Sequence, residues 1–219
     1  GGGYTNNTSG EYATIGGGYK NSAQGKFSTI SGGYYNVASG YGAVIAGGGY
    51  WSENETYNEA TGEYFPTIGG GSGNYATESF STISGGYANE AGGSYSTVGG
   101  GTNNEATGSG STVSGGESNN ASGDYSTVGG GYSHVASEYG STVAGGYNNT
   151  SSGNVSTVGG GDNCRALASW STIAGGFNNQ INLGANNSSI SGGLFNVASG
   201  VASTVGGGGS NEASADYST

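Results

Sequence analysis

One aliphatic residue recurs along the whole chain at the end of a Ser-Thr-Val/Ile triplet or a close variant of it. Successive copies lie 15 residues apart, except for two steps that carry eight and two extra residues. The recurring positions are Ile15, Ile30, Ile45, Ile68, Ile83, Val98, Val113, Val128, Val143, Val158, Ile173, Ile190 and Val205. Such a strict period is typical of one supersecondary unit stacked on copies of itself. The pattern therefore predicts a rod of repeats rather than a globular domain.

Alternating positions within each repeat predict two short strands. In a strand, successive side chains point to opposite faces. In the segment 27–31 this alternation places Ile30 inside and Thr29 outside, and in the segment 21–25 it places Ala23 inside. Positions equivalent to 22 vary freely between repeats, as expected of a solvent-facing row.

Glycine marks the two connections between these strands. A Gly-Gly pair follows the aliphatic residue and a single Gly follows the Ala, and glycine adopts positive φ without a Cβ clash. An Asn column lies between them, and its amides are expected to bond to one another and to the turn backbone. The members of this column include Asn21, Asn36, Asn89, Asn104, Asn149 and Asn179.

These elements predict an all-β fold, a parallel β-solenoid or β-roll with one 15-residue repeat per coil and roughly 14 coils. At about 4.8 Å per rung the rod would be on the order of 65–70 Å long. Residues 1–219 are expected to form a single continuous array, a fragment of a longer one. Loop insertions are expected near 50–57 and 180–187.

Composition excludes several classes of function. The chain has 52 Gly, 3 basic and 14 acidic residues and a net charge of −11, so we expect no nucleic-acid partner. No apolar stretch is long enough to span a membrane in this segment. The only cysteine, Cys164, and the only histidine, His134, both replace Asn in its column, which favours a structural role for each. We therefore expect no enzyme activity, no catalytic residue, no metal and no cofactor.

Three surface features are candidates for contact. The first is an outward Thr row, which either orders water or contacts sugars, or only fills a solvated strand face. Its members are Thr82, Thr97, Thr112, Thr127, Thr142, Thr157 and Thr172. The second is a set of Asn-x-Ser/Thr sequons, which are glycosylation candidates or chance matches in an Asn- and Ser-rich chain. These are Asn7, Asn54, Asn120, Asn149, Asn154 and Asn187.

The third feature is the eight-residue interruption, which predicts a loop that protrudes from one face of the solenoid. Tyr50, Trp51 and Tyr57 make this loop a candidate contact site for a sugar or a neighbouring rod.

Two aromatic rows favour self-association. One row lies just before the Ser-Thr-Val/Ile triplet or its variants and includes Phe27, Tyr64 and Tyr95, and the other follows the Gly-Gly pair. These rows either cap the edges of the roll or form a subunit interface. Because each coil buries little apolar area, we expect a homo-oligomer or a filament as the functional form.

The repeat from Asn104 to Val113, and the next one from Asn119 to Val128, resemble the head repeats of trimeric autotransporter (YadA-like) adhesins, here in a 15-residue variant. The resemblance covers essentially the whole chain and rests on short, degenerate repeats. It implies a left-handed parallel β-roll, trimerisation and an outer-membrane-anchored location at the cell surface.

The favoured hypothesis is a structural, non-enzymatic segment of an extracellular fibre or cell-surface adhesin. Its partners would be other copies of itself, together with surface glycans or host matrix. One alternative is a phage tail-fibre β-roll, and another is an ice-binding or carbohydrate-binding solenoid that uses the Thr row.

Overall fold

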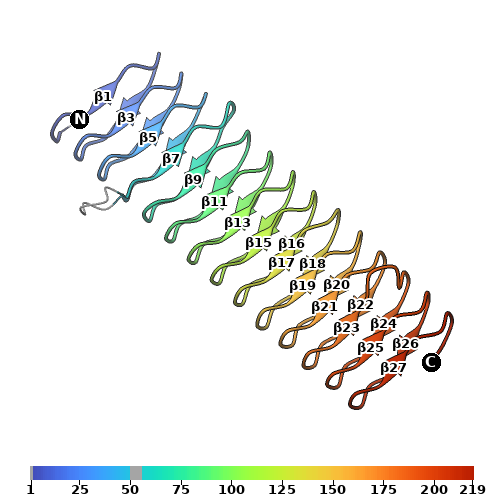
Figure 1. Ribbon diagram of the computed structural model, residues 1–219. Helices are drawn as coiled ribbons and strands as arrows, with labels where there is room; N and C mark the ends of the chain where they lie inside the picture. The colour runs from blue at the N-terminus through green and yellow to red at the C-terminus, as the bar shows by residue number, and fades with distance from the viewer. Residues whose placement is uncertain (1, 50–55) are drawn as a thin grey trace. The chain divides into compact units, whose positions relative to one another are not determined.

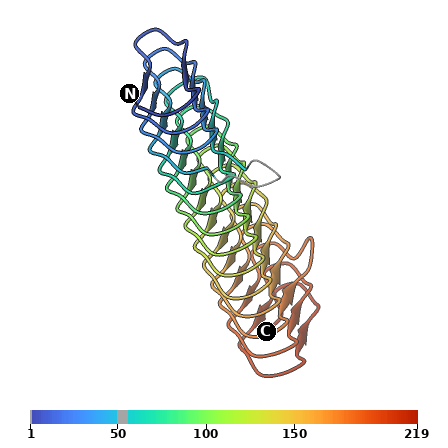
Figure 2. The same ribbon diagram turned by 90° about the vertical axis from the view of Figure 1, so that its left-hand side faces the viewer.

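The computed structural model describes residues 2–49 and 56–219, and it confirms the predicted fold class. Within this part of the chain there is no helix, and the chain winds as a parallel β-solenoid of about 13 turns spaced about 15 residues apart. The coils group into two compact units, residues 1–110 and 111–219. Figures 1 and 2 show the coils of each unit stacked one on the next.

Each coil carries two strands of two residues. In the first unit, one row consists of β1 (Asn7–Thr8), β3 (Ser22–Ala23), β5 (Val37–Ala38), β7 (Glu59–Ala60), β9 (Tyr75–Ala76), β11 (Glu90–Ala91) and β13 (Glu105–Ala106). The other row consists of β2 (Thr14–Ile15), β4 (Thr29–Ile30), β6 (Val44–Ile45), β8 (Thr67–Ile68), β10 (Thr82–Ile83) and β12 (Thr97–Val98).

The second unit repeats this arrangement. Its Thr-Val/Ile row consists of β14 (Thr112–Val113), β16 (Thr127–Val128), β18 (Thr142–Val143), β20 (Thr157–Val158), β22 (Thr172–Ile173), β24 (Ser189–Ile190) and β26 (Thr204–Val205). Its second row consists of β15 (Asn120–Ala121), β17 (Val135–Ala136), β19 (Thr150–Ser151), β21 (Arg165–Ala166), β23 (Gln180–Ile181), β25 (Val197–Ala198) and β27 (Glu212–Ala213).

The strands are shorter than the five-residue segments that the alternation predicts. Ser28 shows why, because its backbone N–H donates to the Gly25 carbonyl at 3.0 Å and so belongs to a tight turn. The backbone N–H of Thr29 then donates to the Ala43 carbonyl of the next coil at 2.8 Å. The backbone N–H of Ser28 is therefore used within the turn, and the strand begins only at Thr29.

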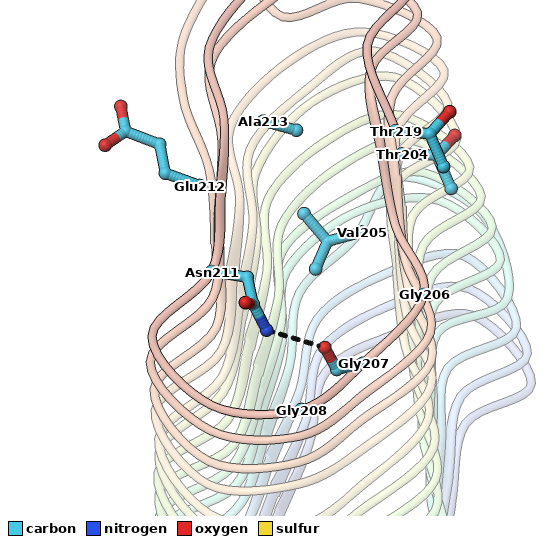
Figure 3. Close-up of a pocket in the computed structure, with 9 residues that line it drawn as sticks. All are labelled: Thr204, Val205, Gly206, Gly207, Gly208, Asn211, Glu212, Ala213 and Thr219. Atoms are coloured by element: carbon cyan, nitrogen blue, oxygen red, sulfur yellow. Dashed lines mark hydrogen bonds between the residues drawn. The ribbon is translucent and has the colours of Figure 1, made fainter.

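The core is a set of columns that run along each unit. Val113 and Ala121 are fully buried while Thr112 is half-buried, as the alternation predicts. Figure 3 shows the same arrangement in the coil of β26 and β27, where Val205 and Ala213 point into the coil and Glu212 and Thr204 point away from it. The inside–outside assignment of the sequence analysis is confirmed at these positions.

The Asn column holds the coils together. Asn36 Nδ2 donates to the carbonyls of Gly32 at 3.1 Å and Gly48 at 2.9 Å, and to Asn21 Oδ1 at 3.1 Å. The backbone N–H of Asn36 donates to the same Asn21 oxygen at 3.0 Å. Asn36 is thereby bonded to its own turn and to both neighbouring coils.

Glycine has different roles in the two turns. At the Gly-Gly turn, Gly18 has φ +93°, as predicted. At the single-Gly turn the prediction is wrong, because the left-handed residue is not Gly25 but the aromatic Phe27, with φ 61°. Gly25 is required for another reason, since a Cβ there would collide with the Gly40 carbonyl of the next coil.

The register of the coils locates the insertions. Val37 pairs with Glu59 and Ile45 pairs with Ile68, so seven of the eight extra residues lie between β6 and β7 and one lies in the turn between β7 and β8. The two later extra residues lie between β23 and β24, because Gln180 pairs with Val197.

Candidate functional site

The Thr row forms a straight line of side chains in each unit. In the second unit Thr127 pairs in register with Thr112 and Thr142, and the row continues through Thr157 and Thr172. In the first unit Thr82 pairs with Thr97 in the same way. All of these threonines are half-buried except Thr172, which is exposed.

A second outward row lies beside the threonines, two residues further along the chain. In the second unit it consists of Ser114, Gly129, Ala144, Gly159, Ala174, Ser191 and Gly206. The Thr row and this small-residue row form a surface that we call the Thr face. Among the described residues, no acidic or basic side chain lies in either row.

The predicted contact loop is described only in part. Tyr57 is half-buried at the start of the segment that leads into β7. Tyr50 and Trp51, like the sequon residue Asn54, lie outside the described residues.

The sequon residues differ in their exposure. Asn7 and Asn187 are exposed, whereas Asn120 and Asn154 are half-buried. Asn149 is fully buried, and its Nδ2 donates to the Gly145 carbonyl at 3.0 Å and the Gly161 carbonyl at 2.8 Å. This amide is therefore not accessible to a glycosylating enzyme while the chain is folded.

Many of the exposed aromatic residues lie at the turns, where rings of neighbouring coils contact one another, either stacked or edge to face. Phe80 stacks on Tyr95 with ring centroids 4.9 Å apart and an interplanar angle of 5°. The preceding member of this row is Phe65, which has φ 51°, and not Tyr64 as the sequence analysis assigned, because one inserted residue shifts this turn. Tyr64 instead forms a β-bridge with Tyr41.

The two rare residues of the Asn column keep part of its hydrogen bonding. The backbone N–H groups of His134 and Cys164 donate to the side-chain oxygens of Asn119 at 3.0 Å and Asn149 at 2.9 Å. Burial lowers the pKa of His134 and raises the pKa of the Cys164 thiol. Both groups are therefore held neutral near pH 7, as structural members of the column.

A hollow of about 510 Å³ lies over the coil of β26 and β27 (Figure 3). Its lining includes Val205, Ala213 and Asn211, whose Nδ2 donates to the Gly207 carbonyl at 2.9 Å. In the preceding coil the equivalent Asn196 Oδ1 accepts the backbone N–H of Asn211 at 3.0 Å. The hollow is thus lined by the same kind of groups that the preceding coil presents to this one.

The described residues contain no candidate metal cluster and no membrane-spanning helix. No group of three or more His, Cys, Asp or Glu side chains in this part of the chain lies close enough to hold a metal ion. None of the described segments is a helix with the length and apolar character needed to cross a membrane.

Comparison with known families gives a match to a short part of the chain. Residues 171–180 match the ubiquitous surface protein adhesin repeat. The matched segment runs from the buried Ser171 through β22 and the Gly-Gly turn to Gln180 at the start of β23. Comparison of the chain with curated protein sequences gives no match.

The matched segment is part of one copy of the unit that recurs along the chain. Together with the solenoid fold, it indicates an adhesin-like repeat region, and so a structural segment of the kind found in surface adhesins.

Proposed function

We propose that the chain is a structural, non-enzymatic segment of an extracellular fibre or cell-surface adhesin, in which residues 1–219 are one continuous array. The match of residues 171–180 to an adhesin repeat carries this proposal, because that segment has the strand, turn and Asn arrangement of the other coils. The resemblance to YadA-like head repeats supports a left-handed roll, a trimer and a location at the cell surface.

The Thr face is the surface through which copies associate. The chain carries a net charge of −11, so most surfaces of two copies repel each other. Acidic residues lie on the opposite strands, as at Glu90 and Glu212, and at the turns, as at Glu138. The uncharged Thr face lets another backbone approach closely without bringing like charges together.

A pair of matched substitutions tests this assignment. Thr142 and Val135 are outward residues of the same coil, Thr142 on the Thr face and Val135 on the opposite row. We expect Thr142→Arg to raise the dissociation constant of the assembly by at least about tenfold, measured by analytical ultracentrifugation, because the arginine blocks close contact. Val135→Arg should leave the assembly intact.

Two results would contradict the proposal. One is a native chain that stays monomeric at micromolar concentration with its full β-sheet circular dichroism signal. The other is an equal loss of association in the two variants, which would place the interface elsewhere.

The same Thr row supports a second candidate function, in which the ordered hydroxyls bind ice or a carbohydrate. The observation in its favour is the in-register line of hydroxyl groups from Thr112 to Thr172. Thermal hysteresis of the purified chain separates ice binding from the structural role. A phage tail-fibre roll would share the fold and is distinguished by the domains encoded beside this segment.

Tyr50, Trp51 and Tyr57 remain the proposed contact loop of the adhesin. Surface glycans or host matrix proteins are the proposed partners, since aromatic side chains combine an apolar face with a polar group. Binding of the chain to arrays of glycans and matrix proteins is the direct measurement.

A further inference from the structure

Two exposed tyrosines of the second unit lie face to face on neighbouring coils. The rings of Tyr132 and Tyr147 have centroids 5.1 Å apart and an interplanar angle of 8°. Tyr132 is 41% exposed and Tyr147 is 53% exposed, so a solvent-borne oxidant reaches both phenols. The two residues also form a parallel β-bridge, which fixes their backbones side by side.

This geometry suits one covalent reaction. One-electron oxidation of a phenol, with loss of its proton, gives a phenoxyl radical whose unpaired electron is shared with the ring carbons ortho to the oxygen. The orbitals that hold this electron are perpendicular to the ring plane. Two radicals therefore couple most directly when their rings lie face to face, as the rings of Tyr132 and Tyr147 do.

We propose that Tyr132 and Tyr147 are a dityrosine cross-linking site that joins consecutive coils covalently. The oxidant is hydrogen peroxide used by a haem peroxidase. One peroxide takes two electrons and two protons from the two phenols and leaves as two waters. A carbon–carbon bond then forms between the ortho carbons, and the two ring hydrogens move to the oxygens, which restores both aromatic rings and both phenols.

The consequence is a covalent link in a chain that has no second cysteine for a disulfide. The link closes a loop of one repeat, so it prevents the two coils from separating when the solenoid opens locally. Tyr4 and Tyr19 of the first unit repeat the arrangement, with centroids 5.5 Å apart and an interplanar angle of 8°.

The chain contains its own reference pair. Tyr125 and Tyr139 are 62% and 53% exposed, and their centroids lie 5.6 Å apart, but their rings meet edge to face at 71°. The two pairs have similar exposure and separation, so radicals form on them at similar rates. The ratio of their products then reports on ring orientation.

The experiment treats the full 219-residue chain with a haem peroxidase and hydrogen peroxide at low protein concentration. Dityrosine fluorescence and peptide mass spectrometry then locate each cross-link by its loss of two hydrogen atoms. We expect the 132–147 link to exceed the 125–139 link several-fold and to be independent of protein concentration. Tyr147→Phe, which keeps the ring but removes the phenol, should abolish it, while Tyr139→Phe should leave it unchanged.

Three results would overturn the proposal. The first is equal amounts of the two links, and the second is dityrosine that forms only between molecules and increases with protein concentration. The third is a 132–147 link of normal yield in urea-unfolded chain, which would show that the fold does not direct the coupling.

Discussion

Replacing His134 by asparagine should stabilise the chain, and the gain should increase as the pH falls. The imidazole Nδ1 accepts the backbone N–H of Asn149 at 3.0 Å, so the neutral side chain carries its proton on Nε2. That Nε2 is buried and makes no hydrogen bond of normal geometry among the described residues, although the Gly146 carbonyl lies near enough to favour the protonated ring. The corresponding amide of Asn149 donates to two carbonyls, at 3.0 and 2.8 Å.

The stability gained by His134→Asn has one part that is independent of pH and one part that depends on it. A buried donor without a well-formed hydrogen bond costs up to about 1–3 kcal/mol, and His134→Asn removes this cost at pH 7.5. Burial lowers the pKa of His134 in the folded chain below its ordinary value of 6.5, although the Gly146 carbonyl opposes the shift. The unfolded chain therefore binds the proton first as the pH falls.

The sign of the pH dependence follows from this shift. The stability that depends on neutral His134 is complete above about pH 6.5 and is lost below it, by up to about 1.4 kcal/mol per pH unit, until the folded pKa is reached. Between pH 7.5 and 5.5 the advantage of His134→Asn should therefore grow by up to about 1.4 kcal/mol. All other residues are identical in the two proteins, so their contributions cancel in the comparison.

Hydrogen exchange followed by mass spectrometry is the appropriate assay, because a repeat protein opens locally. Protection of the coils around residue 134 is compared between the two proteins at pH 7.5 and 5.5, after correction for intrinsic exchange rates. Cys164→Asn is the matched control, since it restores Asn in the same column and its buried thiol stays neutral over this range. A His134→Asn advantage that is absent, or that is the same at both pH values, would refute the reasoning.

Two further predictions concern the core and the turns. Val128→Asp buries a carboxyl in the aliphatic column and should lower the free energy of unfolding by at least about 3 kcal/mol in thermal melts. Thr127→Asp, at the half-buried neighbouring position, should lower it by less than about 1 kcal/mol. Similar losses of stability in the two variants would contradict the inside–outside assignment. Gly25→Ala should destabilise the chain by about 1–3 kcal/mol in urea unfolding, because its Cβ meets the Gly40 carbonyl. In the control Gly32→Ala the Cβ has no heavy atom closer than 4.0 Å, so its stability should change by less than about 0.5 kcal/mol. A Gly25→Ala variant of unchanged stability would disprove the close approach of the coils.

The period and the alternation were sufficient to predict the solenoid and its buried columns. They succeed because in-register stacking repeats one environment at every equivalent position, so that Ile30 and Val128 report the same site. The left-handed conformation of Phe27 could not be predicted this way, since aromatic residues rarely adopt positive φ and glycine stands two positions away.

The misassignment of Tyr64 has a related cause. Both Tyr64 and Phe65 are aromatic, and the sequence does not indicate how eight extra residues divide between two turns. Whether a candidate surface binds anything depends on the shape and charge of its partner. The repeat period of this chain carries no information about such a partner. Only the absence of charge in the Thr row was readable from the sequence.

The hydrogen bonds of the Asn column also bear on how such a chain evolves. Asn36 donates its backbone N–H and its Nδ2 to the side-chain oxygen of Asn21 in the coil before it. Asn89 bonds to Asn74 in the same way. Loss or duplication of one whole repeat in the gene would therefore join two surfaces that already fit each other. Unequal recombination between repeats would change the reach of the segment while leaving its local chemistry unchanged, which makes length the property that selection can adjust most freely.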